Sequence, residues 1–232
     1  MAKAFVFPGQ GSQSVGMGKA LADAYPAARA VFAEVDDALG ENLSTIMWEG
    51  PSETLTLTEN AQPALMAVSM AIIRTLHDEY GLKLSDRVDY VAGHSLGEYS
   101  ALCAAGAFSV TDAAQLLRAR GRAMQQAVPV GHGAMAALLG VGMDVARAVA
   151  ADAAQGDVCD IANDNDPGQV VLSGSKAAID RVLATAKSYG VRRALPLPVS
   201  APFHCSLMRP AANSMAEVLA SATVLSPSVP LV

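Results

Sequence analysis

Short apolar runs alternate with amphipathic stretches along the first part of the chain. Residues 3–7, "KAFVF", are predicted to form a buried strand that ends at Pro8 and leads into a glycine-rich loop. Residues 19–40 have the spacing of a helix, in which Pro26 marks a break or kink and Gly40 marks the stop. This region therefore predicts a strand, a loop and a broken helix.

The longest predicted helix covers residues 58–81, where apolar side chains are nearly continuous up to Gly81. A helix that is apolar on all sides is expected to be deeply buried. After it the pattern predicts a strand over 88–92, a tight turn and two further helices, the second of which is capped by Ser109 or Thr111.

The pattern changes after Val130. Residues 131–199 read as strand, helix, strand, strand, helix, strand, which is the order of a split βαβ or ferredoxin-like unit. We therefore predict an α/β protein in which a small subdomain, 131–199, is inserted into a larger α/β domain formed by 1–130 and 200–232. The last residues, "VPLV", resemble the beginning of a further strand.

Composition and charge exclude several classes of protein. The chain has 232 residues, of which 52% are hydrophobic and 16% charged, as expected for a globular protein with a substantial core. A net charge of −6 argues against a nucleic-acid partner, because binding phosphates requires a basic face. Neither a secretory signal nor a stretch long enough to span a membrane is evident, so we predict a cytoplasmic protein without a membrane partner.

The cysteines and histidines do not indicate a metal site. The three cysteines, Cys103, Cys159 and Cys205, are far apart in the sequence, and the four histidines are equally dispersed. Zinc sites require pairs of ligands at close spacing. The sequence therefore predicts a reducing compartment and no metal.

Residues 93–97, "GHSLG", match the Gly-x-Ser-x-Gly turn that presents a nucleophilic serine between a strand and a helix. The flanking predictions supply both elements. The two glycines would relieve crowding in a sharp turn, while Ser95 would accept backbone strain in order to expose its hydroxyl. The backbone N–H of Leu96, at the start of the helix, could donate to an oxyanion.

A serine nucleophile needs a base, which one of the histidines would provide. His94 is adjacent to the serine, and consecutive side chains on a strained turn point apart. His204 follows a proline-stiffened loop and comes after the serine in the chain, as in hydrolase-type arrangements, so it is the favoured base. His132 remains a second candidate. Cys205 is interpreted as a small buried thiol.

Arg120 lies on the apolar stripe of the helix predicted after Ser109, whereas Arg118 and Arg122 share a side that can face water. An inward guanidinium is costly unless a carboxylate pairs with it. That partner is either an internal acid such as Glu98 or a carboxylate on the substrate.

Five motifs that run in order along the chain resemble the malonyl-CoA:acyl-carrier-protein transacylases of fatty acid synthesis and the acyltransferase domains of polyketide synthases. They are "FPGQGSQ" at 7–13, "GHSLGEYSA" at 93–101, "RGRAMQ" at 120–125, "NDNDPGQVVLSG" at 163–174 and "VSAPFHCSLM" at 199–208. The resemblance implies an α/β-hydrolase-like large domain with a ferredoxin-like insert. It also implies transfer of a malonyl group from malonyl-CoA to the phosphopantetheine thiol of acyl carrier protein, without a cofactor of the enzyme's own.

The resemblance assigns a role to each site residue. Ser95 would carry the malonyl ester, and His204 would act as its base. Arg120 would bind the malonyl carboxylate, while the backbone N–H groups of Gln10 and Leu96 would form the oxyanion hole. Phe203, directly before the base, would fill the space of an α-methyl group and so favour malonyl over methylmalonyl.

Members of this family extend beyond the point that corresponds to Val232, and a glutamine in that part helps to hold the histidine. From this we expect an incompletely supported His204. Alternatives are therefore a serine esterase or thioesterase with the same turn, and an acyltransferase fold without activity. A phosphate loop at 9–19 is excluded, because Gly18-Lys19 is followed by alanine rather than by serine or threonine.

Overall fold

The computed structural model describes residues 2–232, which divide into two compact units. The first contains the described residues up to Arg122 together with Glu217–Val232, and the second contains Ala123–Ala216. Both boundaries fall within helices, namely α7 (Val110–Ala127) and α10 (Arg209–Ala220). Each unit has hydrophobic clusters of its own.

The first unit is built around α5 (Thr58–Tyr80), whose buried residues are nearly continuous over its first half. This confirms the predicted deep burial for the first part of the helix, whereas Ile72 is 45% exposed and the last turn, up to Tyr80, is exposed as well. The helix closes at Gly81, which has a φ of 64° and whose N–H bonds to the carbonyl of His77. Phe32, Met66 and Leu117 are among the largest side chains of the surrounding core.

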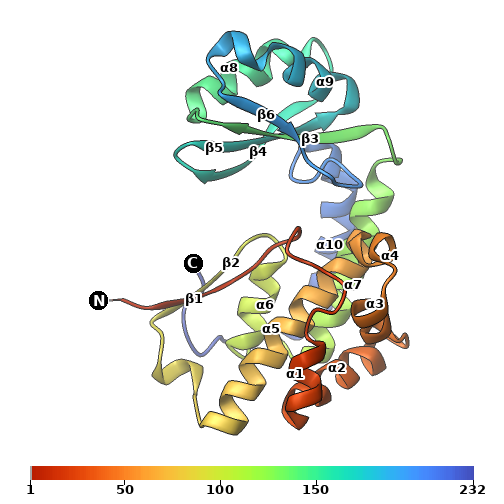
Figure 1. The fold of residues 1–232 in the computed structure, drawn as a ribbon, viewed down its shortest axis with the longest axis vertical. Helices are drawn as coiled ribbons and strands as arrows, with labels where there is room; N and C mark the ends of the chain where they lie inside the picture. Colours follow the sequence, from red (N-terminus) through yellow and green to blue (C-terminus); the bar gives the residue numbers. More distant parts are fainter. Residues whose placement is uncertain (1) are drawn as a thin grey trace. The chain divides into compact units, whose positions relative to one another are not determined.

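Further helices pack in this unit, as Figure 1 shows. The predicted broken helix is confirmed as α1 (Lys19–Ala24) and α2 (Pro26–Leu39), with Pro26 in the first turn of α2 and Gly40 in the left-handed conformation at its end. The sequence pattern did not predict α3 (Leu43–Glu49), α4 (Ser52–Thr56) or the short 3₁₀ helix η1 (Leu84–Asp86).

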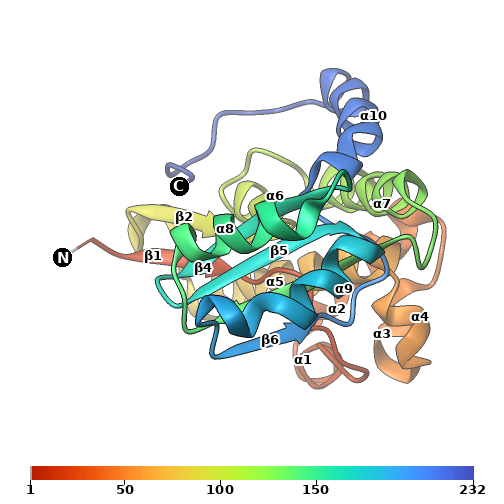
Figure 2. The same ribbon diagram turned by 90° about the horizontal axis from the view of Figure 1, so that it is seen from above.

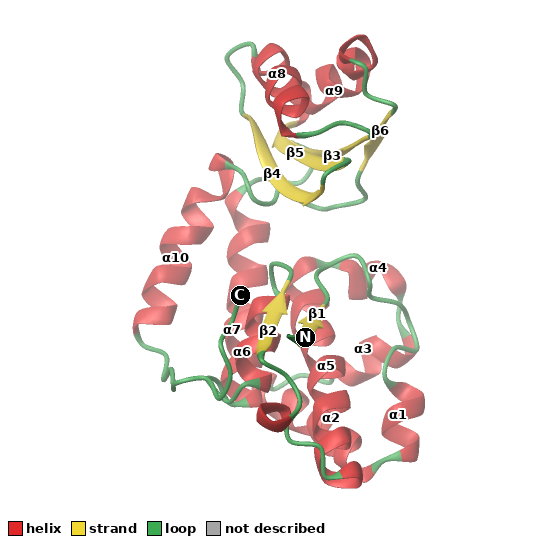
Figure 3. Cartoon of the chain, turned by 90° about the vertical axis from the view of Figure 1, so that its left-hand side faces the viewer, coloured by secondary structure: helices red, strands yellow, loops and turns green. Residues whose placement is uncertain are grey.

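The strands of this unit are β1 (Ala4–Phe7) and β2 (Tyr90–Gly93), which pair in parallel and lie side by side (Figure 3). Leu231 adds an isolated parallel bridge to Val91, at the place where the terminal "VPLV" predicted a beginning strand. Helix α6 (Gly97–Ala104) follows β2 after a tight turn, as predicted. Ser109 caps α7, since its Oγ accepts a 2.9 Å hydrogen bond from the backbone N–H of Asp112.

The second unit contains an antiparallel sheet with the strand order β4-β5-β3-β6. Helices α8 and α9 cover one face of it, which Figure 1 and Figure 2 show from two directions. The elements follow the order that the sequence pattern predicts. Their bounds are β3 (Gly133–Leu139), α8 (Met143–Ala154), β4 (Cys159–Asp166), β5 (Gln169–Ser175), α9 (Lys176–Thr185), η2 (Ala186–Tyr189), β6 (Arg193–Pro196) and η3 (Ser206–Met208).

Alternating residues of the central strand β3 belong to two different hydrophobic clusters. Ala136 and Leu138 pack with α8 and α9, whereas Met135 and Ala137 pack with Phe203 and other residues on the opposite face. A strand that is buried on both faces has a continuous apolar sequence. The predicted subdomain 131–199 lies inside this unit, and its exact bounds as a domain stay a prediction.

None of the described helices combines the length and the apolar character that crossing a membrane requires.

Candidate active site

Ser95 occupies the sharp turn between β2 and α6. Its φ is 55°, in the left-handed region that residues with a side chain seldom adopt. A Cβ added to Gly93 would lie 1.9 Å from the carbonyl carbon of Gly97, and a Cβ added to Gly97 would lie 2.4 Å from the carbonyl oxygen of Phe7. Only glycine fits at these two positions, because the turn brings three backbone segments into contact.

Positive φ values single out two of the predicted site residues. Among the described residues other than glycine, Ser95, Gln155 and His204 have a positive φ, which is 59° at His204. Such conformations cost roughly 1–3 kcal/mol each and cluster at functional sites. The backbone strain at Ser95 and His204 thus marks the same two residues that the sequence motifs single out.

Leu96 directly precedes α6, and its side chain is buried. The turn is closed by hydrogen bonds from the backbone N–H of Gly97 to the carbonyl of His94 and from that of Glu98 to the carbonyl of Ser95. The first N–H groups of a helix have no carbonyl partner within the helix. The N–H of Leu96 is therefore suited to stabilise negative charge that develops beside Ser95.

Arg120 extends from α7 to the serine. One terminal nitrogen, NH2, donates a 3.0 Å hydrogen bond to Oγ of Ser95, and NH1 donates a 2.7 Å bond to Oε1 of Gln62. The guanidinium carbon lies 5.8 Å from the ring centre of Tyr99. Burial lowers the pKa of Arg120, and Tyr99 and Glu98 act in the opposite direction.

Within the described residues of its unit, Arg120 forms no ion pair with a carboxylate. Glu98 therefore forms no ion pair with this guanidinium, and its negative charge acts on Arg120 from a longer distance. The groups that Arg120 contacts directly are a hydroxyl and an amide, so this partly buried cation has no carboxylate at hydrogen-bond distance among the described residues of its unit. It is thereby prepared to bind an anion near the serine.

A chain of hydrogen bonds leads from Arg120 to the first glycine-rich loop. Gln62 donates from Nε2 to Oγ1 of Thr58 at 2.9 Å, and Thr58 donates from Oγ1 to Oε1 of Gln10 at 2.8 Å. The sequence pattern did not identify Thr58 or Gln62. A pattern in the sequence could have indicated them: Thr58 and Gln62 are polar, lie four positions apart and so share one face of a largely apolar helix.

Gly121 allows α7 to approach the start of α5 closely. A Cβ at this position would lie 2.5 Å from Cα of Glu59 and 2.7 Å from the carbonyl oxygen of Thr58. Because the two backbones nearly touch there, the neighbouring Arg120 can reach Gln62 directly.

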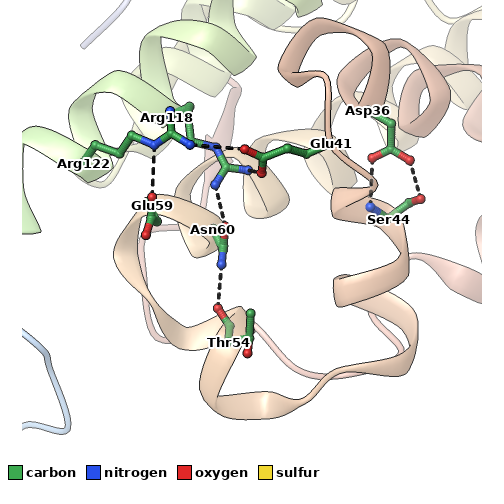
Figure 4. Close-up of polar contacts among 8 residues, drawn as sticks. All are labelled: Asp36, Glu41, Ser44, Thr54, Glu59, Asn60, Arg118 and Arg122. Carbon is green, nitrogen blue, oxygen red and sulfur yellow. Dashed lines mark hydrogen bonds and ion pairs between the residues drawn. The ribbon is translucent and has the colours of Figure 1, made fainter.

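Arg118 corrects one expectation from the sequence. It was predicted to share a water-facing side with Arg122, but it is only 6% exposed. Its guanidinium donates a 2.6 Å hydrogen bond to Oδ1 of Asn60 and lies 3.0 Å from a carboxylate oxygen of Glu41 (Figure 4). Burial lowers the pKa of Arg118, and Glu41 acts in the opposite direction.

Arg122 extends the same network at its exposed edge. It pairs with Glu41 and with Glu59, in each case at 3.1 Å (Figure 4). Asn60 in turn donates from Nδ2 to the carbonyl oxygen of Thr54 at 2.8 Å. The network therefore connects α7 with the loop after α2 and with the first turn of α5.

His204 and Phe203 belong to the second unit. His204 is exposed, whereas Phe203 is buried among Met124, Met135 and other apolar side chains. The structure thus brings Ser95, Leu96, Arg120 and, through Thr58 and Gln62, Gln10 together within one unit. The pairing of His204 with Ser95 stays a prediction.

Contacts within the second unit fix the segment that carries His204. Asp160 accepts a 2.7 Å hydrogen bond from the backbone N–H of Ser206, and Sγ of Cys205 donates to the carbonyl of Pro202 at 3.1 Å. A Cβ on Gly133 would lie 2.2 Å from the Pro202 ring, so β3 begins in contact with this segment. Burial raises the pKa of Cys205, which disfavours its thiolate, although the residue is half-buried rather than buried as the sequence predicted.

Within residues 2–232, the His, Cys, Asp and Glu side chains do not form a group of three or more that could hold a metal ion.

Comparison with known proteins connects this geometry to one family. The acyl transferase domain family matches residues 4–232. The malonyl CoA-acyl carrier protein transacylase of Bacillus subtilis is 46% identical over 230 residues, which cover 99% of this chain and 71% of the relative.

Solved structures agree with the sequence comparison. The acyl-carrier-protein-S-malonyltransferase of Bartonella henselae is 56% identical, with a TM-score of 0.96 over 100% of this chain and 73% of that one. A malonyl-transacylase in complex with its type II PKS acyl-carrier protein is 44% identical, with a TM-score of 0.95 over 100% of this chain and 74% of that one. The chain therefore belongs to the acyl transferase domain family, with an α/β fold and with malonyl CoA-acyl carrier protein transacylases as relatives.

Proposed function

We propose that this chain transfers a malonyl group from malonyl-CoA to the phosphopantetheine thiol of acyl carrier protein, through an ester at Ser95. The observation that carries the proposal is the hydrogen bond between Arg120 and Ser95, made by a cation that forms no ion pair with a carboxylate among the described residues of its unit. An acyl group with its own carboxylate would supply the missing charge at the distance where the serine reacts.

In the first half-reaction, Oγ of Ser95 attacks the thioester carbonyl carbon while His204 takes the hydroxyl proton. The negative charge moves to the former carbonyl oxygen, which accepts hydrogen bonds from the N–H groups of Gln10 and Leu96. When the intermediate collapses, the carbon–sulfur bond breaks. His204 returns the proton to the departing sulfur, so coenzyme A leaves as a thiol and the malonyl group remains on Ser95.

In the second half-reaction, His204 deprotonates the thiol of the phosphopantetheine arm. The sulfur attacks the ester carbonyl, the same N–H groups stabilise the oxyanion, and Oγ of Ser95 leaves with the proton. Throughout both steps Arg120 holds the malonyl carboxylate with two parallel N–H···O bonds. The phosphopantetheine arrives on the carrier protein, and we expect no cofactor of the enzyme's own.

His204 is the preferred base, because it is exposed and has the same unusual backbone conformation as Ser95. His132, the second candidate, lies in the turn before β3, and the structure gives it no positive φ. We propose further that Phe203 selects against an α-methyl group on the substrate.

We propose a more specific fold for each of the two units. The order of elements and strands in the second unit supports a ferredoxin-like subdomain. The strand, turn and helix around Ser95 support an α/β-hydrolase-like large domain. A cytoplasmic location, where the expected carrier protein would be found, remains part of the proposal.

The deciding experiment is incubation of the chain with malonyl-CoA followed by intact-mass and peptide-mapping mass spectrometry. We expect a malonyl adduct on Ser95 that persists until a phosphopantetheine thiol is added, and no adduct on Ser95→Ala. If Ser95→Ala were still acylated, the proposed mechanism would be wrong. Rapid release of free malonate without a thiol acceptor would favour a hydrolase instead.

A further inference from the structure

Thr58, the first residue of α5, has its hydroxyl in the middle of the hydrogen-bond chain behind the candidate active site. Its side chain is fully buried, at 0% exposure. The hydroxyl donates to Oε1 of Gln10 at 2.8 Å and accepts from Nε2 of Gln62 at 2.9 Å. Thr58 therefore connects the loop that carries Gln10 with the residue that holds Arg120.

The chemistry of the groups determines which group donates and which accepts in each of these hydrogen bonds. A guanidinium can only donate hydrogen bonds, so Gln62 must turn its Oε1 towards Arg120. Its Nε2 then faces Thr58 and donates to it. The hydroxyl has one hydrogen, which is consequently available for Oε1 of Gln10, and the orientation of every amide follows from the positive charge at Arg120.

We propose that Thr58 is a positioning residue that couples the oxyanion loop to the site that binds the acyl carboxylate. The inference rests on the proposed function. Thr58 acts through Gln10 at one end, where the backbone N–H would stabilise the oxyanion of any acyl group. At the other end it acts through Gln62 on Arg120, which matters most for acyl groups with a carboxylate.

The position of Thr58 is itself well supported. Its carbonyl oxygen and Cα of Glu59 lie against Gly121 of α7, where even one added methyl group would not fit. Two residues further along, Asn60 accepts the 2.6 Å hydrogen bond from the buried Arg118. Contacts with α7 therefore fix the backbone of the first turn of α5. As a result, the position from which the Thr58 hydroxyl extends is also fixed.

The matched test replaces this hydroxyl without changing the shape of the side chain. Thr58→Val removes it, and Thr58→Ser keeps it. Thr75→Val is the control. It removes another buried hydroxyl of the same helix, and that hydroxyl donates a 2.7 Å hydrogen bond to the carbonyl of Ala71. For each variant, the rate constant of Ser95 acylation is measured with malonyl-CoA and with acetyl-CoA, which lacks the carboxylate.

We expect Thr58→Val to slow acylation by acetyl-CoA about tenfold, as for the loss of one hydrogen bond at the oxyanion loop. Acylation by malonyl-CoA should fall by roughly a further tenfold, because Arg120 is also less well held. Thr58→Ser should remain within about threefold of the wild type, whereas Thr75→Val should change neither rate constant.

The inference is overturned if folded Thr58→Val acylates at wild-type rates, or if Thr58→Ser loses as much activity as Thr58→Val. Should Thr58→Val fail to fold, Thr58→Ala is measured instead, and wild-type rates for it would equally refute the coupling. A wild-type chain that forms no malonyl adduct would refute the proposed function itself, so the two failures are distinguishable.

Discussion

Arg120 and Ser95 are in direct contact, since one guanidinium nitrogen donates a 3.0 Å hydrogen bond to the serine hydroxyl. A positive charge at this distance stabilises negative charge that develops on the oxygen. The second nitrogen is oriented by Gln62, so the guanidinium is held as a planar fork beside the serine. The contact between Arg120 and Ser95 therefore indicates that the serine is the reacting group and that the acyl group it binds carries a carboxylate.

Replacing Arg120 should change the substrate preference more than the reactivity. For Arg120→Met we expect kcat/KM with malonyl-CoA to fall roughly 100-fold or more, because two charge-assisted hydrogen bonds to the carboxylate are lost. Acylation by acetyl-CoA should fall far less. Steady-state competition between the two thioesters measures this ratio, and an unchanged ratio would contradict the assigned role.

Gly121→Ala tests the close approach of α7 to α5. The added methyl would lie 2.5 Å from Cα of Glu59, so the helices must move apart, at a cost of about 1–3 kcal/mol. We expect malonyl transfer to fall about tenfold as the hydrogen bond from Arg120 to Gln62 lengthens. Gly168→Ala is the control, because its methyl would meet only Oδ1 of Asp166, at 3.7 Å.

Arg118→Met should destabilise the first unit. Asn60 would lose the donor of a 2.6 Å bond and Glu41 would lose its buried partner, which we expect to cost about 2–4 kcal/mol. Thermal unfolding should show a Tm roughly 5–10 °C below the wild type. Arg122→Met, whose side chain is 50% exposed, should shift Tm by much less, and equal shifts would contradict this account.

Phe203→Ser tests substrate selection. If the ring excludes an α-methyl group, the ratio of methylmalonyl to malonyl transfer should rise about tenfold. Phe203 is buried in the core of its unit, so the variant should also lose about 3–5 kcal/mol of stability, and its folding must be checked in parallel. An unchanged ratio in a folded Phe203→Ser variant would remove this role.

Alkaline pH should destabilise the protein through Cys103. Burial raises the pKa of this thiol to about 12, whereas an unfolded thiol titrates near about 8.5. Its contribution to stability is complete below the unfolded value. It declines as the pH rises towards the folded value, because only the unfolded state then releases the proton, by up to about 1.4 kcal/mol per pH unit.

Urea unfolding at a series of pH values checks this slope. Cys103→Ala should give a shallower decline above about pH 9, whatever its stability at neutral pH. Val110→Ala removes a buried side chain from the same cluster without removing a titratable group, so it should keep the wild-type slope. Identical slopes for Cys103→Ala and the wild type would show that this thiol does not contribute.

The sequence predicted the structural elements that depend on residues close together along the chain. The glycines around Ser95 indicated a sharp turn, and the structure shows that neighbouring backbone atoms leave no room for a side chain there. The helix over 58–81 was evident from its nearly continuous apolar residues and its stop from Gly81, which the structure shows in the left-handed conformation. Short α3 and α4 were missed, because five to seven residues carry too little periodicity.

The sequence by itself determined the α/β class, which follows from the order of its apolar patterns. It also determined the serine turn, from the two glycines, and the inward position of Arg120, from its place on the apolar stripe of a helix. Only the tertiary structure decided what each polar group touches. It buried Arg118 against Glu41, joined Thr58 to Gln10 across 48 positions of sequence, and placed Arg120 beside Ser95 with no ion-paired carboxylate among the described residues of its unit. The reason is physical: hydrogen-bond partners depend on how helices pack, and packing brings together residues whose spacing along the chain carries no sign of it.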